Sequence, residues 1–365
     1  MSQHLRIKRH NKFFTDREDR SIMRYHDSAS LNRYLNPLVA GASSGVATID
    51  WIEACEYCTD KTPLAMIIAS DRREPEKRLR VATLLAEAAN LPLFVVEYAS
   101  TKDYRGNLDI ARFYVRRVSP EPTKPWRMTP AEYAGFLLRL RRVHYETHHR
   151  TRLNELSAAS EPGPYIRPNE RITDPSILYS EWHRMKNIVR FMGGLRTPGA
   201  LDTARSLMMV DLDTVETCPL CSQPMALMEY HRPSSRRPEM PKYAAVTRAV
   251  GLRAGLPTYS VMNMPTPDGT DITAFHVRTL GPRSPEEYVR MTPEEFAVFL
   301  LGFRETHYQE HHPESLHHVG VKREAPAPRF QRGYSCGSCR SRGRARGAAR
   351  HATIEEVREC SRRAC

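Results

Sequence analysis

Apolar and polar residues follow two spacings along the chain, one typical of helices and the other typical of strands. Between residues 77 and 92, apolar side chains such as Leu84 and Ala88 recur every three or four positions, which predicts a helix with one buried face. Further helices are predicted at residues 21–35, 128–149, 176–191, 242–257 and 291–312. Short runs rich in Val, Ile, Tyr and Phe predict strands at residues 63–70, 93–99, 110–118, 224–231, 258–263 and 272–280.

The same order of elements occurs twice, about 160 residues apart, as helix, strand, strand, helix, strand, strand, helix. The last helix of each copy begins with Thr-Pro and a Glu two residues further on, which predicts a capping box with Pro at the first helical position. A strand, helix, strand succession favours a right-handed parallel crossover. The sequence therefore predicts a tandem duplication of a small α/β unit.

The predicted boundaries between domains, linker and tails follow from the residue composition along the chain. Residues 151–175 are polar and rich in Pro, as linkers are, and residues beyond about 316 are mainly Arg, Gly, Ala, Ser and Pro, which cannot form a large core. The predicted organisation is a basic arm at 1–20, a first unit at 21–150, a linker at 151–175, a second unit at 176–315 and a basic tail at 316–365.

Charge is concentrated at the two ends of this 365-residue chain, whose formal net charge is +13. Basic ends on a nearly neutral body are typical of proteins that bind nucleic acid, although a solubilising tail has the same composition. Frequent Arg, Ala and Pro suggest a GC-rich coding sequence of actinobacterial or phage origin. The sequence has neither a membrane-spanning apolar run nor a signal peptide, so a cytoplasmic location is expected, while the oligomeric state is left open.

Six of the eight cysteines form CxxC pairs, a spacing at which one tight turn directs two thiolates at a single Zn²⁺. Pairs of histidines four residues apart on the last helix of each unit could complete a structural zinc site. The expected ligands are Cys55, Cys58, His144 and His148 in the first unit, and Cys218, Cys221, His307 and His311 in the second. Buried cysteines with histidines near a helix C-terminus are the alternative, and a redox pair is a weaker one.

The basic tail contains the remaining cysteines. Cys336, Cys339, Cys360 and Cys365 could form a small zinc knuckle together with His351. An unstructured Arg/Gly tail that contacts phosphates is an equally favoured alternative. The arginines expected to contact nucleic acid are Arg340, Arg342, Arg344, Arg346 and Arg350.

Two acidic residues of the second unit are candidate ligands of a catalytic cation. Asp213 precedes the CxxC pair, and Glu229 ends the next predicted strand, with His231 two residues further on. Carboxylates are the ligands that Mg²⁺ prefers, and a neighbouring base could orient the attacking water. A solvated Glu-His pair and a capping Asp are the structural alternatives.

This arrangement resembles the PD-(D/E)xK nuclease superfamily, over roughly residues 176–263. The resemblance implies a fold of helix, strands, helix and strand, with Asp on one strand and Glu-x-Lys on the next. It also implies that Glu181 corresponds to an acid that some members carry on their first helix. His231 stands where Lys is usual, and Lys242 is a possible replacement.

In the first unit, Asp50 matches Asp213, but Ile68 and Ser70 stand in place of Glu229 and His231. The first unit is therefore expected to be catalytically inactive. The motifs of ATPases, dehydrogenases, serine hydrolases and zinc metalloproteases are not found in the sequence. The leading expectation is a Mg²⁺-dependent nucleic-acid phosphodiesterase. The main alternative is a non-enzymatic nucleic-acid-binding protein with structural zinc, and a protein-interaction adaptor is a third possibility.

Overall fold

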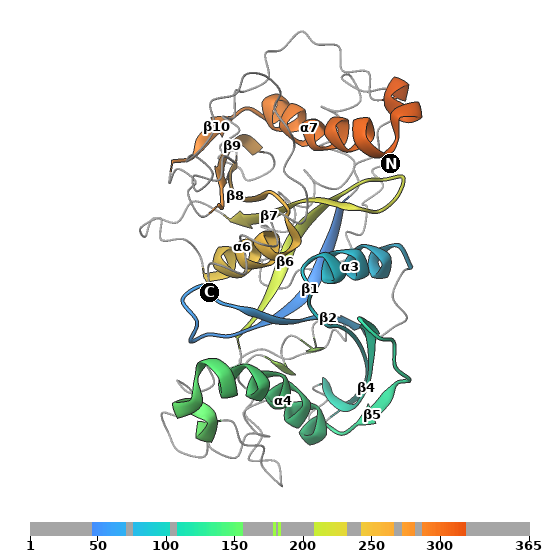
Figure 1. The fold of residues 1–365 in the computed structure, drawn as a ribbon, viewed down its shortest axis with the longest axis vertical. Helices are drawn as coiled ribbons and strands as arrows, with labels where there is room; N and C mark the ends of the chain where they lie inside the picture. Colours follow the sequence, from blue (N-terminus) through green and yellow to red (C-terminus); the bar gives the residue numbers. More distant parts are fainter. Residues whose placement is uncertain are drawn as a thin grey trace, which may run out of the picture. The chain divides into compact units, whose positions relative to one another are not determined.

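Ten strands of the chain form one mixed β-sheet, in the order β10-β9-β8-β7-β6-β1-β2-β3-β4-β5 (Figure 1). The computed structural model describes residues 46–70, 76–102, 108–155, 178–179, 182–183, 208–231, 242–265, 272–281 and 287–318. All of them belong to one compact unit that spans residues 1–328. The predicted α/β class is confirmed.

The first half of the molecule contributes five strands to the sheet and has two α-helices. Its elements, in chain order, are β1 (Val46–Ala54), β2 (Pro63–Ser70), α3 (Glu76–Ala88), β3 (Leu93–Lys102), β4 (Leu108–Ser119), β5 (Trp126–Met128), α4 (Pro130–His148) and the 3-10 helix η1 (Arg150–Glu155). Strands β2 and β3 are parallel, as the predicted crossover through α3 requires. The other neighbouring pairs in this half are antiparallel.

The second half has the same order of elements. They are β6 (Met208–Thr217), β7 (Pro224–His231), α6 (Lys242–Ala254), β8 (Thr258–Pro265), β9 (Ile272–Thr279), β10 (Val289–Met291), α7 (Pro293–His311) and η4 (Pro313–His318). The parallel pair is again the one joined by a helix, β7 with β8. The predicted capping boxes are present at the start of α4 and of α7. The three-residue edge strands β5 and β10 were not predicted, because such short segments have no period of their own.

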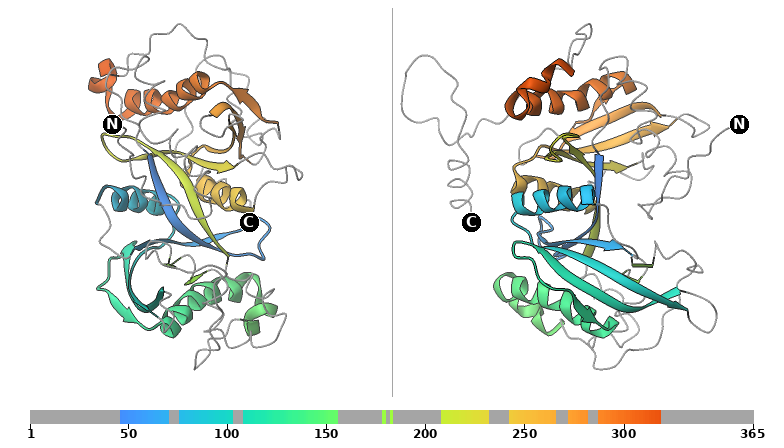
Figure 2. Two further views of the ribbon diagram at one scale, coloured as in Figure 1. Left: turned by 180° about the vertical axis from the view of Figure 1, so that it is seen from behind. Right: turned by 90° about the vertical axis from the view of Figure 1, so that its right-hand side faces the viewer.

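The two halves are joined by antiparallel pairing of β1 with β6. Beneath this junction, α3 and α6 share one hydrophobic core, in which Ile68 and Val81 of the first half pack together with Leu227 and Val250 of the second. Figure 2 shows the two helices side by side. The described parts of the two predicted units therefore form one continuous sheet with a common core.

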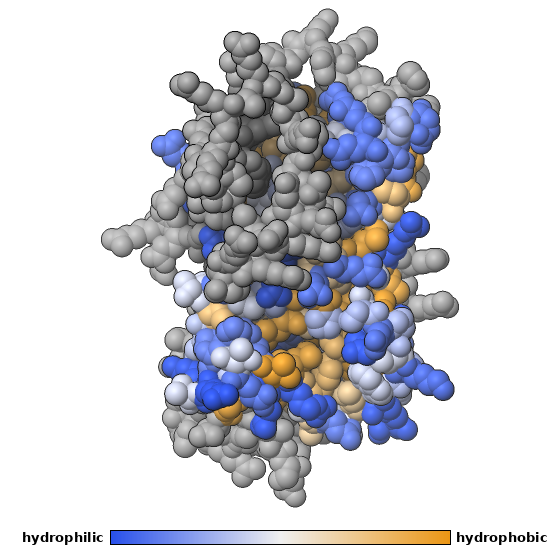
Figure 3. Space-filling view, in the orientation of Figure 1, coloured by the Kyte–Doolittle hydropathy of each residue, from blue (hydrophilic) through white to orange (hydrophobic). Residues whose placement is uncertain are grey.

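Each half has a second core on the opposite face of the sheet. Alternate residues of β2 face opposite sides, so Ile67 belongs to the core under α4, whereas Ile68 belongs to the shared core. The corresponding core of the second half lies under α7. Figure 3 shows that apolar residues also reach the surface of the described part, between hydrophilic ones. No helix among the described residues has the length and apolar character needed to cross a membrane.

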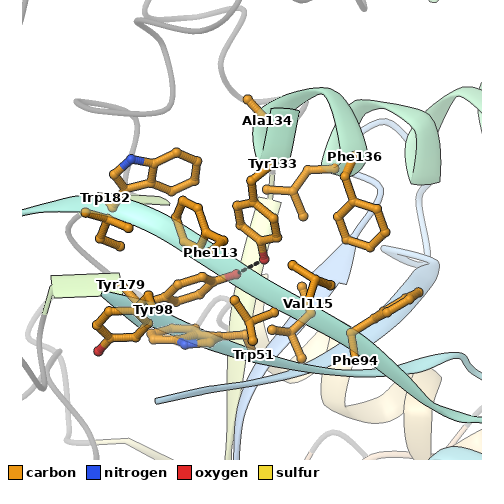
Figure 4. Close-up of a cluster of buried hydrophobic side chains, with 14 of the residues drawn as sticks. Trp51, Phe94, Tyr98, Phe113, Val115, Tyr133, Ala134, Phe136, Tyr179 and Trp182 are labelled. Atoms are coloured by element: carbon orange, nitrogen blue, oxygen red, sulfur yellow. Dashed lines mark hydrogen bonds between the residues drawn. The ribbon is translucent and has the colours of Figure 1, made fainter. Parts of the chain in front are cut away.

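Residues just before the second half pack into the core of the first. Leu178, Tyr179 and Trp182 are fully buried there, and the hydroxyls of Tyr179 and Tyr133 lie 2.6 Å apart (Figure 4). These are described residues of the helix predicted at 176–191, which the sequence-based boundary at residue 175 assigned to the second unit. The helix predicted at 21–35 lies outside the described residues.

A buried ionic group connects this segment with β1 and α4. Glu53 forms ion pairs with Arg141 and His183, and all three side chains are almost completely buried. Burial acts to raise the pKa of Glu53, but the charges of His183 and Arg141 outweigh it and hold the pKa at about 2. In the second half, Arg304 lies 4.0 Å from Glu216, whose pKa is raised to about 7 by burial.

Replacing Arg141 with Met is expected to lower the free energy of unfolding by about 3–5 kcal/mol, because it leaves the buried Glu53 without its guanidinium partner. Urea denaturation would measure the change. The control is Arg80→Met at an exposed position of α3, with an expected change below about 0.5 kcal/mol. A loss of similar size in both variants would contradict the assignment.

Helix α6 packs closely on the start of β8 at Gly251. A Cβ at this position would lie 1.8 Å from Thr258 Oγ1 and 3.2 Å from the Leu256 carbonyl oxygen. Gly251→Ala is therefore expected to destabilise the protein by about 1–3 kcal/mol, measured by thermal melting. The matched control is Gly302→Ala in α7, where no atom lies within 4 Å and helix propensity should stabilise by about 0.5–1 kcal/mol.

Candidate metal centres and carboxylate site

The turn between β1 and β2 carries the first CxxC pair. The backbone N–H of Cys55 donates to the Thr62 carbonyl (2.9 Å), and Lys61, which has a positive φ of 52°, donates to the Cys58 carbonyl (3.1 Å). The turn between β6 and β7 repeats this arrangement, with Cys218 donating to Gln223 (2.9 Å) and a positive φ of 65° at Ser222. Each turn therefore closes tightly and holds its two thiols at the end of a hairpin.

Histidines from the end of the last helix in each half complete two four-residue clusters. The clusters are Cys55, Cys58, His144 and His149 in the first half, and Cys218, Cys221, His307 and His312 in the second. Within each cluster the four potential ligand atoms all lie within 4.8 Å of one another. These two groups are the candidate metal centres of the described residues.

The distances fit one tetrahedral ion in each centre. Cys58 Sγ lies 3.1 Å from His144 Nε2 and 3.2 Å from His149 Nε2, and Cys221 Sγ lies 3.3 Å from His307 Nε2. Ligands at about 2.0–2.3 Å from Zn²⁺ in a tetrahedron are roughly 3.5 Å from one another. Small shifts of the side chains would therefore suffice for zinc coordination.

His148 and His311 were predicted as ligands, but the structure brings His149 and His312 to the thiols instead. Helix α4 ends at His148, whose side chain is exposed. His149 is the C-cap residue, and its non-helical backbone (φ −143°, ψ 47°) directs its ring to Cys58. His312 has the same role after α7. The His-His doublet in both copies was the signal in the sequence, but helical spacing pointed to His148 and His311, whereas the clusters contain the next histidine of each doublet.

Three histidines of the two centres, His144, His149 and His307, have a lowered pKa, which favours the neutral imidazole. Burial, followed by the charges of His148 and His149, lowers the pKa of His144 to about 4. Burial likewise lowers the pKa of His307 and raises the pKa of the Cys58 and Cys221 thiols. A neutral imidazole is the form that binds a metal, whereas each thiol has to lose its proton on binding.

The candidate carboxylates lie on the neighbouring strands β6 and β7. Thr214 of β6 is paired with Met228 of β7. Asp213 and Glu229 are the next residues along these antiparallel strands, so they lie opposite each other and face the same side of the sheet. Asp213 accepts a hydrogen bond from the Tyr230 N–H (2.8 Å), and Glu229 accepts one from the Thr247 hydroxyl (2.8 Å).

Both carboxyl groups are largely buried, with 9% of Asp213 and 5% of Glu229 exposed. Burial, followed by the negative charges of Asp213 and Asp211, raises the pKa of Glu229 well above its usual range. Negative charges that interact in a buried environment disfavour ionisation of both carboxyl groups at the same time.

His231 lies on the same face of β7, two residues beyond Glu229. Its Nδ1 is 3.4 Å from Ser260 Oγ and its Nε2 is 3.3 Å from the Tyr288 hydroxyl. Burial, followed by the positive charge of Arg278, lowers the pKa of His231 to about 4. The Arg278 guanidinium in turn lies over the Tyr288 ring, 5.0 Å from its centroid.

Three neutral residues of this group were not predicted, namely Thr247, Ser260 and Tyr288. Thr247 could have been found in the sequence, because aligning α6 with α3 pairs it with the apolar Ala82. Ser260 is on β8 and Tyr288 directly precedes β10, and only the fold brings them to His231.

The first half has no equivalent carboxylate pair at this position. Asp50 forms an ion pair with Arg78 of α3 and accepts a hydrogen bond from the Ala69 N–H (3.1 Å). Ile68, in place of Glu229, is fully buried in the shared core together with Val81. The charge of Asp50 is thus neutralised within the protein.

Several predicted site residues lie outside the described residues. They are Glu181, the tail cysteines Cys336, Cys339, Cys360 and Cys365, and the tail arginines Arg340, Arg342, Arg344, Arg346 and Arg350. Lys242 is the first residue of α6, but its side chain is not among those described.

Comparison with known proteins identifies no relative. No protein-family model, no curated protein and no solved structure matches this chain.

Proposed function

We propose that the protein is a metal-dependent phosphodiesterase acting on nucleic acid, with its chemistry in the second half. The observation that carries this proposal is the position of Asp213 and Glu229, buried on one face of neighbouring strands and electrostatically coupled. A buried pair of like charges lowers stability, so its presence favours a function that uses it.

The elements around the pair agree with the resemblance to the PD-(D/E)xK superfamily. Asp213 is on β6, Glu229 is on the antiparallel neighbour β7, and α6 then leads to the parallel strand β8. This is the order of strands, helix and strand that the resemblance implies. We infer in addition that the two halves arose by tandem duplication, since they share strand order, pairing and capping boxes.

Each residue has a defined part in the proposed reaction. Asp213 and Glu229 would hold Mg²⁺, which would supply stabilisation of the charge that develops on the phosphate. His231, oriented by the hydroxyls of Ser260 and Tyr288, positions the attacking water. The first half retains Asp50 but lacks the second carboxylate, so it does no chemistry and contributes binding.

The two Cys/His clusters have a structural role in this proposal. Each cluster ties the hairpin turn of one half to the end of its last helix, across more than 80 residues of chain. A Cys₂His₂ set that uses four protein ligands has no open position for a substrate, which is typical of structural zinc.

A second candidate is a non-enzymatic nucleic-acid-binding protein with structural zinc. It is favoured by the presence of the Cys/His clusters in both halves, whereas the carboxylate pair occurs in one half only.

One assay separates the two candidates. The full-length protein is incubated with plasmid and with single-stranded DNA, with Mg²⁺ and with EDTA. Mg²⁺-dependent cleavage is expected. Salt-sensitive binding without cleavage of either substrate would replace the enzyme with the second candidate.

A further inference from the structure

A groove in the first half lies between the edge strand β5 and the start of α4. It has a volume of about 530 Å³ and is lined by Trp126, Arg127, Met128, Ala131, Glu132, Gly135 and Arg139. That volume is within the range of about 300–1,000 Å³ that is usual for sites of small ligands. No part of the candidate catalytic site lines it.

The helix sequence explains why the groove is open. Ala131, Gly135 and Arg139 are four residues apart and therefore lie on one face of α4. A Cβ at Gly135 would lie 3.6 Å from the Arg139 guanidinium, so two small residues leave a hollow beside this cation.

The side chains around the groove combine an exposed indole with positive charge. Trp126 is 40% exposed, whereas Trp51 and Trp182 are buried at 6% and 0%. Arg127 and Arg139 are exposed, and among the described residues neither has a hydrogen bond or ion pair that would neutralise it. The carboxylate of Glu132 accepts a hydrogen bond from the Thr129 N–H, as the capping box requires.

The second half differs at the corresponding positions. Val289 replaces Trp126, Glu294 replaces Ala131, Val298 replaces Gly135 and Gly302 replaces Arg139. The indole, the hollow and one of the two arginines are therefore specific to the first half, although the capping box and the neighbouring strand are the same in both.

We propose that this groove binds single-stranded nucleic acid, with a base stacked on Trp126 and adjacent phosphates on Arg127 and Arg139. An exposed aromatic ring beside cations is the arrangement by which single strands are held without sequence readout. Addition of a peptide strand fits less well, because β5 has only three residues to pair with it.

The inference extends the proposed function by separating two roles. The first half holds a nucleic-acid strand at the β5 edge of the sheet, and the second half cleaves that nucleic acid. It rests on nucleic acid being the substrate, but on no property of the carboxylate pair.

Tryptophan fluorescence tests the groove directly, since Trp126 is the one exposed residue of the three tryptophans of the chain. Titration of the full-length Glu229→Gln variant with a fifteen-nucleotide oligo-dT should quench the emission. Trp126→Phe should abolish the quenching, and Trp126→Ala should weaken binding about ten- to hundredfold. Arg139→Ala should weaken binding and reduce its salt dependence by about one phosphate contact.

Controls come from the second half. Val289→Ala and Arg290→Ala alter the equivalent strand and should leave the affinity for oligo-dT unchanged, and circular dichroism should show that every variant is folded. Unchanged affinity in Trp126→Ala would overturn the proposal, as would tighter binding of poly-glutamate than of oligo-dT with the same quenching.

The outcomes distinguish the groove from the catalytic proposal. Cleavage by the parent protein with unaltered binding in Trp126→Ala rejects the groove alone. Oligo-dT binding that depends on Trp126, without any cleavage by the parent, supports the groove and rejects the enzyme.

Discussion

The His149→Ala variant is expected to lose one zinc ion per chain, whereas His148→Ala should keep the full complement. Both residues are at the end of α4, but only His149 lies against Cys58, at 3.2 Å. Metal content of purified protein, measured by mass spectrometry, would show the difference. The same contrast is expected between His312 and the exposed His311.

Loss of zinc should also destabilise the first half. Structural zinc contributes apparent binding free energies of about 10–16 kcal/mol in small zinc domains, and a fold with its own core loses only part of that. We expect Cys58→Ser to lower the free energy of unfolding by several kcal/mol, and EDTA to have no further effect on this centre. Equal zinc in the parent and in His149→Ala would reject the ligand assignment.

Glu229→Gln is expected to reduce Mg²⁺-dependent cleavage by about a thousandfold, which corresponds to roughly 4 kcal/mol of transition-state stabilisation. The amide has the shape of the carboxylate and can still accept the Thr247 hydrogen bond, so the site should keep its structure. Single-turnover cleavage of labelled DNA would measure the rate. Asp213→Asn should cause a similar loss.

The same substitution should raise the melting temperature, because a neutral amide is buried beside Asp213 and Asp211 without the free-energy cost of protonating a carboxylate. Lower activity together with higher stability would exclude misfolding as the cause. The matched control is Asp50→Asn in the first half, which should leave the cleavage rate unchanged, since Asp50 is paired with Arg78. Cleavage by Glu229→Gln at the parental rate would reject the catalytic assignment.

Local chemistry in the sequence was sufficient for much of the fold. The spacing of Leu84 and Ala88 predicted α3, and the Thr-Pro-x-Glu pattern predicted the start of α4, because helix periodicity and capping depend on neighbouring residues alone. The parallel pairing of β2 with β3 followed from the succession of strand, helix and strand, because a crossover helix returns the chain to the same end of the sheet. The CxxC spacing is equally local, and it predicted Cys55 and Cys58 as candidate metal ligands.

Only the tertiary structure decided the contacts between distant segments. The pairing of β1 with β6 and the burial of Trp182 in the first-half core depend on which apolar faces meet, and many partners satisfy the same pattern. The choice of His149 over His148 depends on backbone angles after the helix end. The hydroxyls of Ser260 and Tyr288 reach His231 because β7, β8 and the residue before β10 converge there, which no spacing along the chain encodes.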